Sequence, residues 1–219
     1  IFRRRRFVRR RRRLGELVMI SDQDRQRISD AIRAVEEKTS GEIVCVLMRS
    51  ASAYSYAPVL WATFVALVTP WLLLAFTHLS VVRMLTCQVA VFIAVGLILS
   101  LSPLRFALVP PAIKRKRAHR AAMEQFFARG VTQARNRMGV MIFVALGEHY
   151  ARVIADDGVA TLVDQRAWQA TVDALTREIA AGRIAEGFID AIGRCGEVLA
   201  RHAPPDGEAH VVPDRIYVI

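Results

Sequence analysis

Cysteine is scarce in this sequence, and the short motifs of several large enzyme classes are missing. The three cysteines, Cys45, Cys87 and Cys195, lie far apart, so neither a disulfide framework nor the paired spacing of a zinc site is present. An odd number of dispersed thiols is typical of a reducing compartment. The sequence also has no HExxH, GxGxxG, Walker, GxSxG or CxxC motif. These absences remove the sequence support for a zinc protease, a dinucleotide-dependent enzyme, a P-loop enzyme or an α/β-hydrolase.

Charge is absent from two long segments in the middle of the chain. Residues 57–77 and 84–104 contain no Asp, Glu, Lys or Arg. As helices, these segments would each span about 30 Å, the hydrocarbon thickness of a bilayer. A charge at the bilayer centre costs about 2.5–3.5 kcal/mol, so membrane spans are selected to exclude it. We therefore predict a transmembrane helical hairpin over residues 57–104. The alternative is a pair of buried core helices in a soluble protein.

Basic residues beside these segments predict the orientation of the hairpin. The link between the segments carries one Arg, Arg83, whereas Arg49 precedes the first segment and Arg105 follows the second. Because Lys and Arg concentrate on the cytoplasmic side, we expect a two-pass protein of the bacterial inner membrane with both termini in the cytoplasm. We interpret the next basic residues as a topology determinant at the membrane surface rather than as a nucleic-acid site. This membrane-surface basic cluster consists of Lys114, Arg115, Lys116, Arg117 and Arg120.

The basic character of the chain comes from its first residues. The formal net charge is +11, but nine Arg lie within residues 1–13, so the rest of the chain is close to neutral. Such a composition cannot bury enough apolar surface to fold, and we predict an Arg-rich disordered tail over residues 1–20. The tail has the charge to bind anionic lipid or RNA phosphates. The alternative is that these residues have no role.

Outside the hairpin, the sequence predicts two pieces of one split domain. They cover residues 21–50 and 112–203, and a C-terminal tail follows over 204–219. The first piece begins with a helix capped by Ser21, in which apolar residues recur at helical spacing. A β-branched run over residues 42–49 then predicts a strand that is covered on both faces.

The second piece begins with a basic amphipathic segment over residues 114–137. Strands are predicted over residues 139–146 and 150–156, joined as a β-hairpin, and two amphipathic helices follow. Trp168 is expected to anchor the core. The predicted fold class is therefore α/β, a small mixed β-sheet flanked by helices on both faces and interrupted by the two-helix transmembrane hairpin. The apolar face expected for the amphipathic segment consists of Met123, Phe126, Phe127, Val131 and Ala134.

Several segments of the chain resemble the TPM domain family. They are residues 21–48, residues 137–144 (RMGVMIFV) and residues 148–158 (EHYARVIADDG), and the pattern over residues 168–205 is similar too. The family includes thylakoid acid-phosphatase and photosystem II repair proteins and many bacterial membrane proteins. The resemblance implies a TPM-like domain of the membrane-embedded bacterial branch, extending over residues 21–219 around the hairpin.

The resemblance also implies a chemistry for two adjacent carboxylates. Some family members have phosphatase activity or bind a divalent cation at acids near the ends of the central strands, which correspond here to Asp156 and Asp157. These carboxylates would offer oxygen ligands to Ca²⁺ or Mg²⁺, or position a water for phosphoester attack. The alternative is a turn that ends the strand and caps the next helix. Family members commonly carry an acid just before the strand glycine, whereas this chain has Arg137 and Met138 before Gly139.

Two further sets of residues are candidates for chemistry. Glu148, His149 and Asp156 would suit the roles of acid, base and orienting group if the fold brought them together. Arg137 and Arg152 have the charge to attract a phosphate or a carboxylate from a ligand or a partner, although exposed Arg is usually solvated.

Three functions follow from these observations. The favoured one is a membrane-anchored, non-enzymatic scaffold or maintenance factor for a membrane protein complex, with the bilayer and another membrane protein as its partners. The second is a membrane-bound, divalent-cation-dependent phosphatase. The third is an anionic-lipid or RNA binder that works through the Arg-rich tail; otherwise nucleic acid is not expected as a partner.

Overall fold

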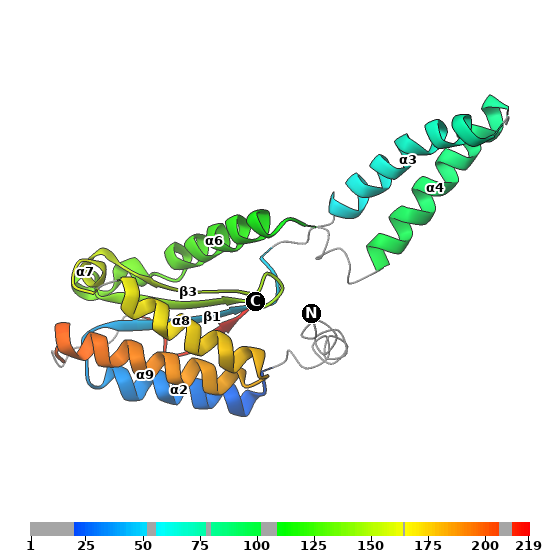
Figure 1. Cartoon of the computed structure of the whole chain (residues 1–219). Helices are drawn as coiled ribbons and strands as arrows, with labels where there is room; N and C mark the ends of the chain where they lie inside the picture. Colours follow the sequence, from blue (N-terminus) through cyan, green and yellow to red (C-terminus); the bar gives the residue numbers. More distant parts are fainter. Residues whose placement is uncertain (1–19, 52–55, 78–79, 102–108, 164, 206–211) are drawn as a thin grey trace. The chain divides into compact units, whose positions relative to one another are not determined.

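The described residues of the computed structural model form two compact units (Figure 1). The structure describes residues 20–51, 56–77, 80–101, 109–163, 165–205 and 212–219. One unit combines the described chain up to Arg49 with the chain from His119 onward, and the other lies between them in the sequence. The predicted Arg-rich tail lies outside the described residues except for Ile20, so its order and its binding to lipid or RNA stay predictions.

A four-stranded mixed sheet forms the centre of the first unit, in the order β3-β2-β1-β4. β1 is parallel to both β2 and β4, whereas β2 and β3 form an antiparallel hairpin. Every residue of β1 and β2 is buried, as expected for strands covered on both faces. The predicted mixed sheet and β-hairpin are confirmed. The strands are β1 (Glu42–Met48), β2 (Gly139–Ala145), β3 (Tyr150–Ala155) and β4 (Ile216–Val218).

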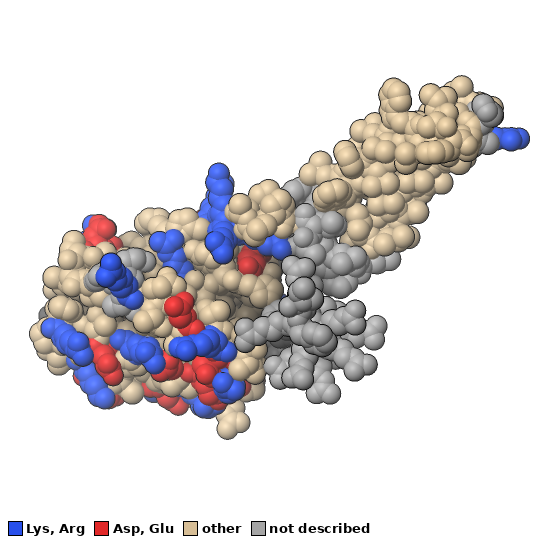
Figure 2. Space-filling view, in the orientation of Figure 1, with Lys and Arg blue, Asp and Glu red and all other residues tan. Residues whose placement is uncertain are grey.

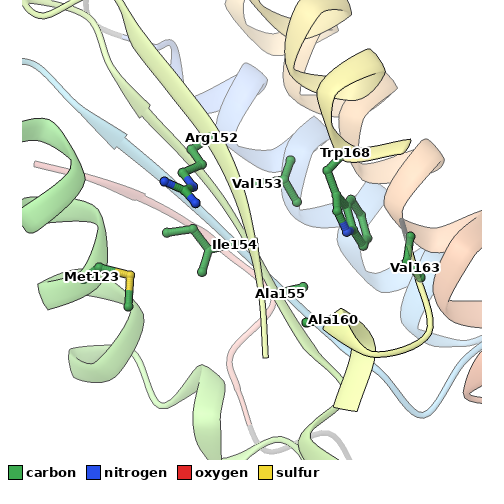
Figure 3. Close-up of a pocket in the computed structure, with 8 residues that line it drawn as sticks. All are labelled: Met123, Arg152, Val153, Ile154, Ala155, Ala160, Val163 and Trp168. Atoms are coloured by element: carbon green, nitrogen blue, oxygen red, sulfur yellow. The ribbon is translucent and has the colours of Figure 1, made fainter. Parts of the chain in front are cut away.

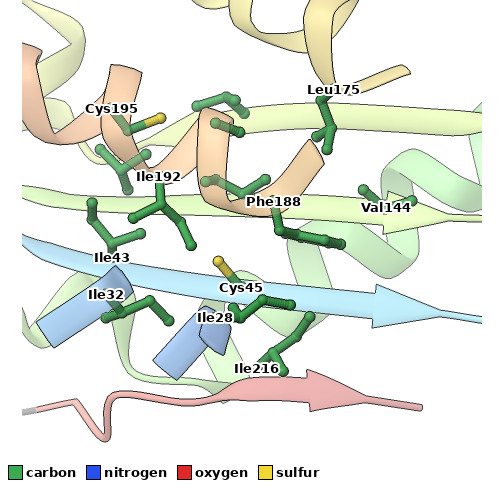
Figure 4. Packing of buried hydrophobic residues seen from close by; sticks show 14 of the residues in the cluster. Ile28, Ile32, Ile43, Cys45, Val144, Leu175, Phe188, Ile192, Cys195 and Ile216 are labelled. Atoms are coloured by element: carbon green, nitrogen blue, oxygen red, sulfur yellow. The ribbon is translucent and has the colours of Figure 1, made fainter. Parts of the chain in front are cut away.

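The main core lies between the sheet and three helices, α2 (Asp22–Glu36), α8 (Gln165–Ala180) and α9 (Ile184–His202) (Figures 1 and 4). α2 begins where predicted, because the Ser21 hydroxyl accepts a hydrogen bond from the Asp24 N–H at 3.0 Å. Trp168 is 4% exposed and belongs to this core, as predicted. Alternate residues of the strands point toward these helices. The core contains Ile43, Cys45 and Val144 from the strands, and Ile28, Ile32, Phe188 and Ile192 from α2 and α9.

The opposite face of the sheet lies beside α6 (Pro111–Ala128), whose residues from His119 onward belong to the same unit (Figure 1). The predicted segment over 114–137 is not one helix. α6 ends at Ala128 because Gly130 adopts a left-handed φ of 70°, and two 3₁₀ turns, η1 (Val131–Gln133) and η2 (Arg135–Arg137), follow. The expected apolar face is also wrong at one position, since Phe126 is 4% exposed but Phe127 is 63% exposed.

β4 and the short helix α7 (Asp157–Ala160) were not predicted from the sequence. β4 lies within residues 204–219, the segment interpreted as a C-terminal tail. It pairs with β1, and the Ile219 N–H donates to the Leu47 carbonyl at 2.9 Å. Three residues are too few to show a periodicity of two, so the strand exists because β1 offers it an edge and a core contact for Ile216.

The second unit contains two apolar helices, α3 (Tyr56–Phe76) and α4 (Val81–Leu101). By length and composition, Pro58–Phe76 and Val81–Ser100 could each cross a membrane, and few of their side chains are buried. The alternative interpretation, a pair of buried core helices, would require these side chains to be buried. α4 begins three residues before the predicted segment and so includes Arg83; residues 102–104 of that segment lie outside the described chain.

Small residues form the contact between α3 and α4. Ala62 is fully buried and Ala66 is 5% exposed, whereas large side chains such as Trp71 point outward. A Cβ added to Gly96 would lie 3.7 Å from the Ala62 Cβ, which is an ordinary van der Waals contact. Small residues at helix contacts are typical of helices that pack within lipid, where close backbone approach supplies the attraction.

Candidate functional site

Asp156, the first of the two predicted carboxylates, is buried at the end of β3 and caps α7. Its residue is 4% exposed, and its Oδ1 accepts a hydrogen bond from the Asp157 N–H at 2.8 Å. Its own N–H donates to the Gly139 carbonyl at 2.9 Å, which extends the pairing between β2 and β3 by one residue. The structure therefore gives Asp156 the capping role that was the structural alternative to a cation ligand.

Arg137 bridges both carboxylates. Its Nη2 lies 3.2 Å from Asp156 Oδ1, and its Nη1 lies 2.9 Å from Asp157 Oδ2. The two contacts differ in strength because the Asp156 side chain is 3% exposed whereas the Asp157 side chain is 77% exposed. An exposed pair contributes little, but removing the partner of a buried carboxylate is costly. Arg137 therefore stabilises the domain mainly through its ion pair with Asp156.

A strained turn places the Arg137 guanidinium over these acids. Asn136 and Arg137 adopt left-handed φ values of 51° and 58°. Gly158 permits the turn to approach α7, since a Cβ at this position would lie 2.4 Å from the Asn136 carbonyl oxygen and 2.7 Å from that of Arg137. Backbone atoms at these distances leave no space for any side chain, so the glycine after the two aspartates is required by packing.

This geometry is a poor match for Ca²⁺ or Mg²⁺. Hard cations need several oxygen ligands, and both carboxylates here already face a guanidinium. Within the described residues, no group of three or more His, Cys, Asp or Glu side chains is placed to hold a metal ion. The cation site at Asp156 and Asp157 therefore remains a prediction that the ion pairs with Arg137 oppose.

The structure does not bring Glu148 and His149 to Asp156. Glu148 and His149 lie in the turn that precedes β3, and the His149 N–H donates to the Leu146 carbonyl at 3.2 Å. Asp156 lies directly after the last residue of β3. At about 3.3 Å per residue, the strand separates the two ends by roughly 20 Å. The fold therefore does not bring these three residues together as acid, base and orienting group.

The membrane-surface basic cluster lies on α6. Arg115, Lys116 and Arg120 are exposed, and Arg120 forms an ion pair with Glu124 at 3.2 Å. Figure 2 shows Lys and Arg side chains over α6, whereas basic and acidic side chains alternate over α2 and α9. A run of positive charge that follows an apolar segment in the sequence is typical of a segment close to anionic lipid.

A cluster of buried acids at the start of β1 was not predicted. Glu36 is 3% exposed, and its Oε1 accepts a hydrogen bond from the Ile43 N–H at 2.9 Å. The pKa of Glu36 is raised to about 9, mainly because the carboxyl is buried and to a smaller extent because it forms a hydrogen bond with Asp214. The available signal was position, since Glu36 continues the buried stripe of Ile28 and Ile32 at intervals of four residues.

By its fold, the protein belongs to the class of α/β domains, here divided in sequence by an apolar helical hairpin. The model of the TPM domain family then matches residues 103–198, which confirms the resemblance to that family over this part of the chain. No curated protein matches the chain. The NMR structure of the BA42 protein from the psychrophilic bacterium Bizionia argentinensis is similar in fold, with a TM-score of 0.57 and 18% sequence identity over 92% of this chain and 96% of that one.

Proposed function

We propose that this TPM-like domain protein is anchored in the bacterial inner membrane and is a non-enzymatic scaffold or maintenance factor for a membrane protein complex. The observation that carries the proposal is the bridge from Arg137 to Asp156 and Asp157. It neutralises the carboxylates that a cation-dependent phosphatase would use and assigns one of them to helix capping. We therefore propose a structural role for these groups and a binding role for the domain.

Membrane anchoring is supported by the composition and exposure of α3 and α4. Both helices are long enough to cross a bilayer, and most of their large apolar side chains are exposed. The orientation with cytoplasmic termini is supported by the basic cluster on α6, compared with the single Arg83 in the first turn of α4. The proposed partners are the bilayer and another membrane protein.

A direct comparison of activities separates the scaffold from the phosphatase. We would purify the full chain in mild detergent and measure hydrolysis of p-nitrophenyl phosphate with Mg²⁺ or Ca²⁺, beside the Asp157→Asn variant. Asp157 is the appropriate position because its side chain is 77% exposed and its replacement leaves the cap formed by Asp156 intact. We expect equal, background rates from both proteins, because the ion pairs with Arg137 occupy the two carboxylates that would bind the cation.

The same preparation tests partner binding. Chemical crosslinking in intact cells, followed by purification of the full chain, is expected to recover one reproducible membrane protein in stoichiometric amount. A chain in which α3 and α4 are retained and the soluble domain is replaced by an unrelated one is the control and is expected to lose that protein. Phosphoester turnover that disappears in Asp157→Asn, or a monomer without any crosslinked partner, would contradict the proposal.

A further inference from the structure

β3 is an edge strand with one unpaired side. It pairs with β2 along one edge and is the last strand in the sheet order. Because the Asp156 N–H bonds to Gly139, the alternation of an antiparallel ladder directs the N–H and C=O groups of Ala151, Val153 and Ala155 away from β2. Within the described residues these groups have no hydrogen-bond partner. Such an edge is a template for pairing with another strand.

A pocket of about 190 Å³ lies beside this edge. Figure 3 shows Met123 of α6 on one side of β3, and Val163 and Trp168 on the other. At about 30 Å³ per water, the pocket holds on the order of six waters, so it is large enough for an apolar side chain. Val153 and Ala155 contribute the strand itself to the lining. The pocket thus joins unpaired backbone to an apolar wall.

Arg152 gives the Met123 side of the edge a positive charge. Its side chain is exposed, and its Nη1 lies 3.2 Å from His119 Nδ1. It forms no ion pair with any carboxylate in the part of the chain that the structure describes. Since Arg152 and Val153 point to opposite sides of β3, an added strand would meet a cation on one side and an apolar surface on the other.

Charge complementarity selects the occupant. The Arg-rich segment over residues 1–13 would bring like charge to Arg152 and is disfavoured. A second copy of β3, paired about Val153, would place two Arg152 side chains diagonally on one face, about 7–8 Å apart. A segment with carboxylates on one face and apolar side chains on the other complements both sides of the edge.

We propose that the free edge of β3 binds an extended segment of a partner protein, in which acidic and apolar residues alternate, by adding it to the sheet as a fifth strand. Its carboxylate pairs with Arg152, and its apolar side chain enters the pocket beside Trp168. This inference rests on the proposed scaffold function and describes how the domain holds a partner.

The test uses the full chain in detergent micelles and a defined probe. The probe is a fluorescein-labelled, end-capped octapeptide that alternates Glu and Val, and fluorescence anisotropy measures its binding. We expect saturable binding that falls at least tenfold in Arg152→Glu. That variant is expected to bind the matching Lys–Val octapeptide instead, which shows that it is folded. Arg201→Glu, an equal change of charge at the exposed end of α9, is expected to bind the Glu–Val probe like the wild type.

Backbone pairing is tested with the same probe N-methylated at alternate residues, which removes the donors of one edge. One of the two N-methylation registers is expected to lose at least tenfold in affinity. Absence of binding by the Glu–Val probe, equal weakening by Arg201→Glu, or indifference to both N-methylation registers would overturn the strand-addition site while leaving the scaffold function to its own test. Phosphoester turnover that depends on Asp157 overturns the scaffold and leaves this binding result unchanged.

Discussion

Replacing Glu36 by Gln is expected to stabilise the α/β domain at neutral pH and to remove much of its pH dependence between about pH 5 and 9. The native carboxyl is buried, and its pKa is raised from 4.5 to about 9. The unfolded chain loses this proton near pH 4.5, whereas the native state keeps it. The native state therefore binds more protons over this range. The contribution of protonated Glu36 to the free energy of unfolding is therefore fully present below pH 4.5 and is lost as the pH rises toward 9.

The expected effect of Glu36→Gln is large. Each pH unit in this interval costs the wild type about 1.4 kcal/mol, so the accumulated loss at pH 7 is about 3 kcal/mol. Gln keeps an oxygen that accepts from the Ile43 N–H, and its amide can donate to Asp214, yet it carries no titrating proton. Most of the loss should therefore disappear in the variant.

Urea unfolding of the full chain in micelles at several pH values measures this effect. Trp168 fluorescence reports on the domain when Trp61 and Trp71 of α3 are replaced by Phe. Glu37→Gln, the same chemical change on the neighbouring exposed residue, is the control and should alter stability little. A wild-type stability that stays flat or rises between pH 5 and 9, or a Glu36→Gln variant less stable than the wild type at pH 7, would show that Glu36 is ionised in the native state.

Gly158→Ala is expected to destabilise the domain by about 2–3 kcal/mol. The new Cβ would meet the carbonyl oxygens of Asn136 and Arg137 at 2.4 and 2.7 Å, and backbone cannot rotate away as a side chain can. Moving that turn also displaces the guanidinium from the buried Asp156 carboxylate, which adds to the loss.

The matched control is Gly193→Ala in α9, where an added Cβ meets nothing within 4 Å. It should stabilise the helix by about 0.5–1 kcal/mol, because alanine is the better helix former. The same urea experiment compares both variants with the wild type. If Gly158→Ala unfolded at the wild-type urea concentration, the close approach of η2 to α7 would not be part of the native structure in solution.

The periodicity of the sequence predicted the parts of the fold that bury a regular stripe. The stripe in α2 and the apolar runs of β1 and β2 were sufficient to predict a helix and two covered strands. The end of α6 was not predicted, because it depends on the left-handed Gly130 within an apparently continuous amphipathic pattern. β4 was missed because three residues carry no period and the pairing partner is remote in sequence.

The candidate site was predicted in composition but not in geometry. The position of Asp156 and Asp157 after a strand indicated functional or capping acids, and Arg137 was noted close to the place where family members commonly carry an acid. Their direct contact spans 19 residues and depends on a left-handed turn and on Gly158, which no spacing rule reveals. Glu36 was missed for a different reason, since a charged residue is not expected on the buried stripe of a helix.

Alkaline carbonate extraction of membranes from bacteria that express the full chain tests the central claim most directly. Insertion of α3 and α4 in the bilayer predicts that the intact chain remains in the membrane pellet at pH 11 and enters the supernatant only with detergent. A peripheral protein held by the basic cluster on α6 would be released, because the carbonate salt screens its electrostatic contacts with anionic lipid and the high pH neutralises the two Lys side chains. Recovery of the intact chain in the carbonate supernatant would contradict the account.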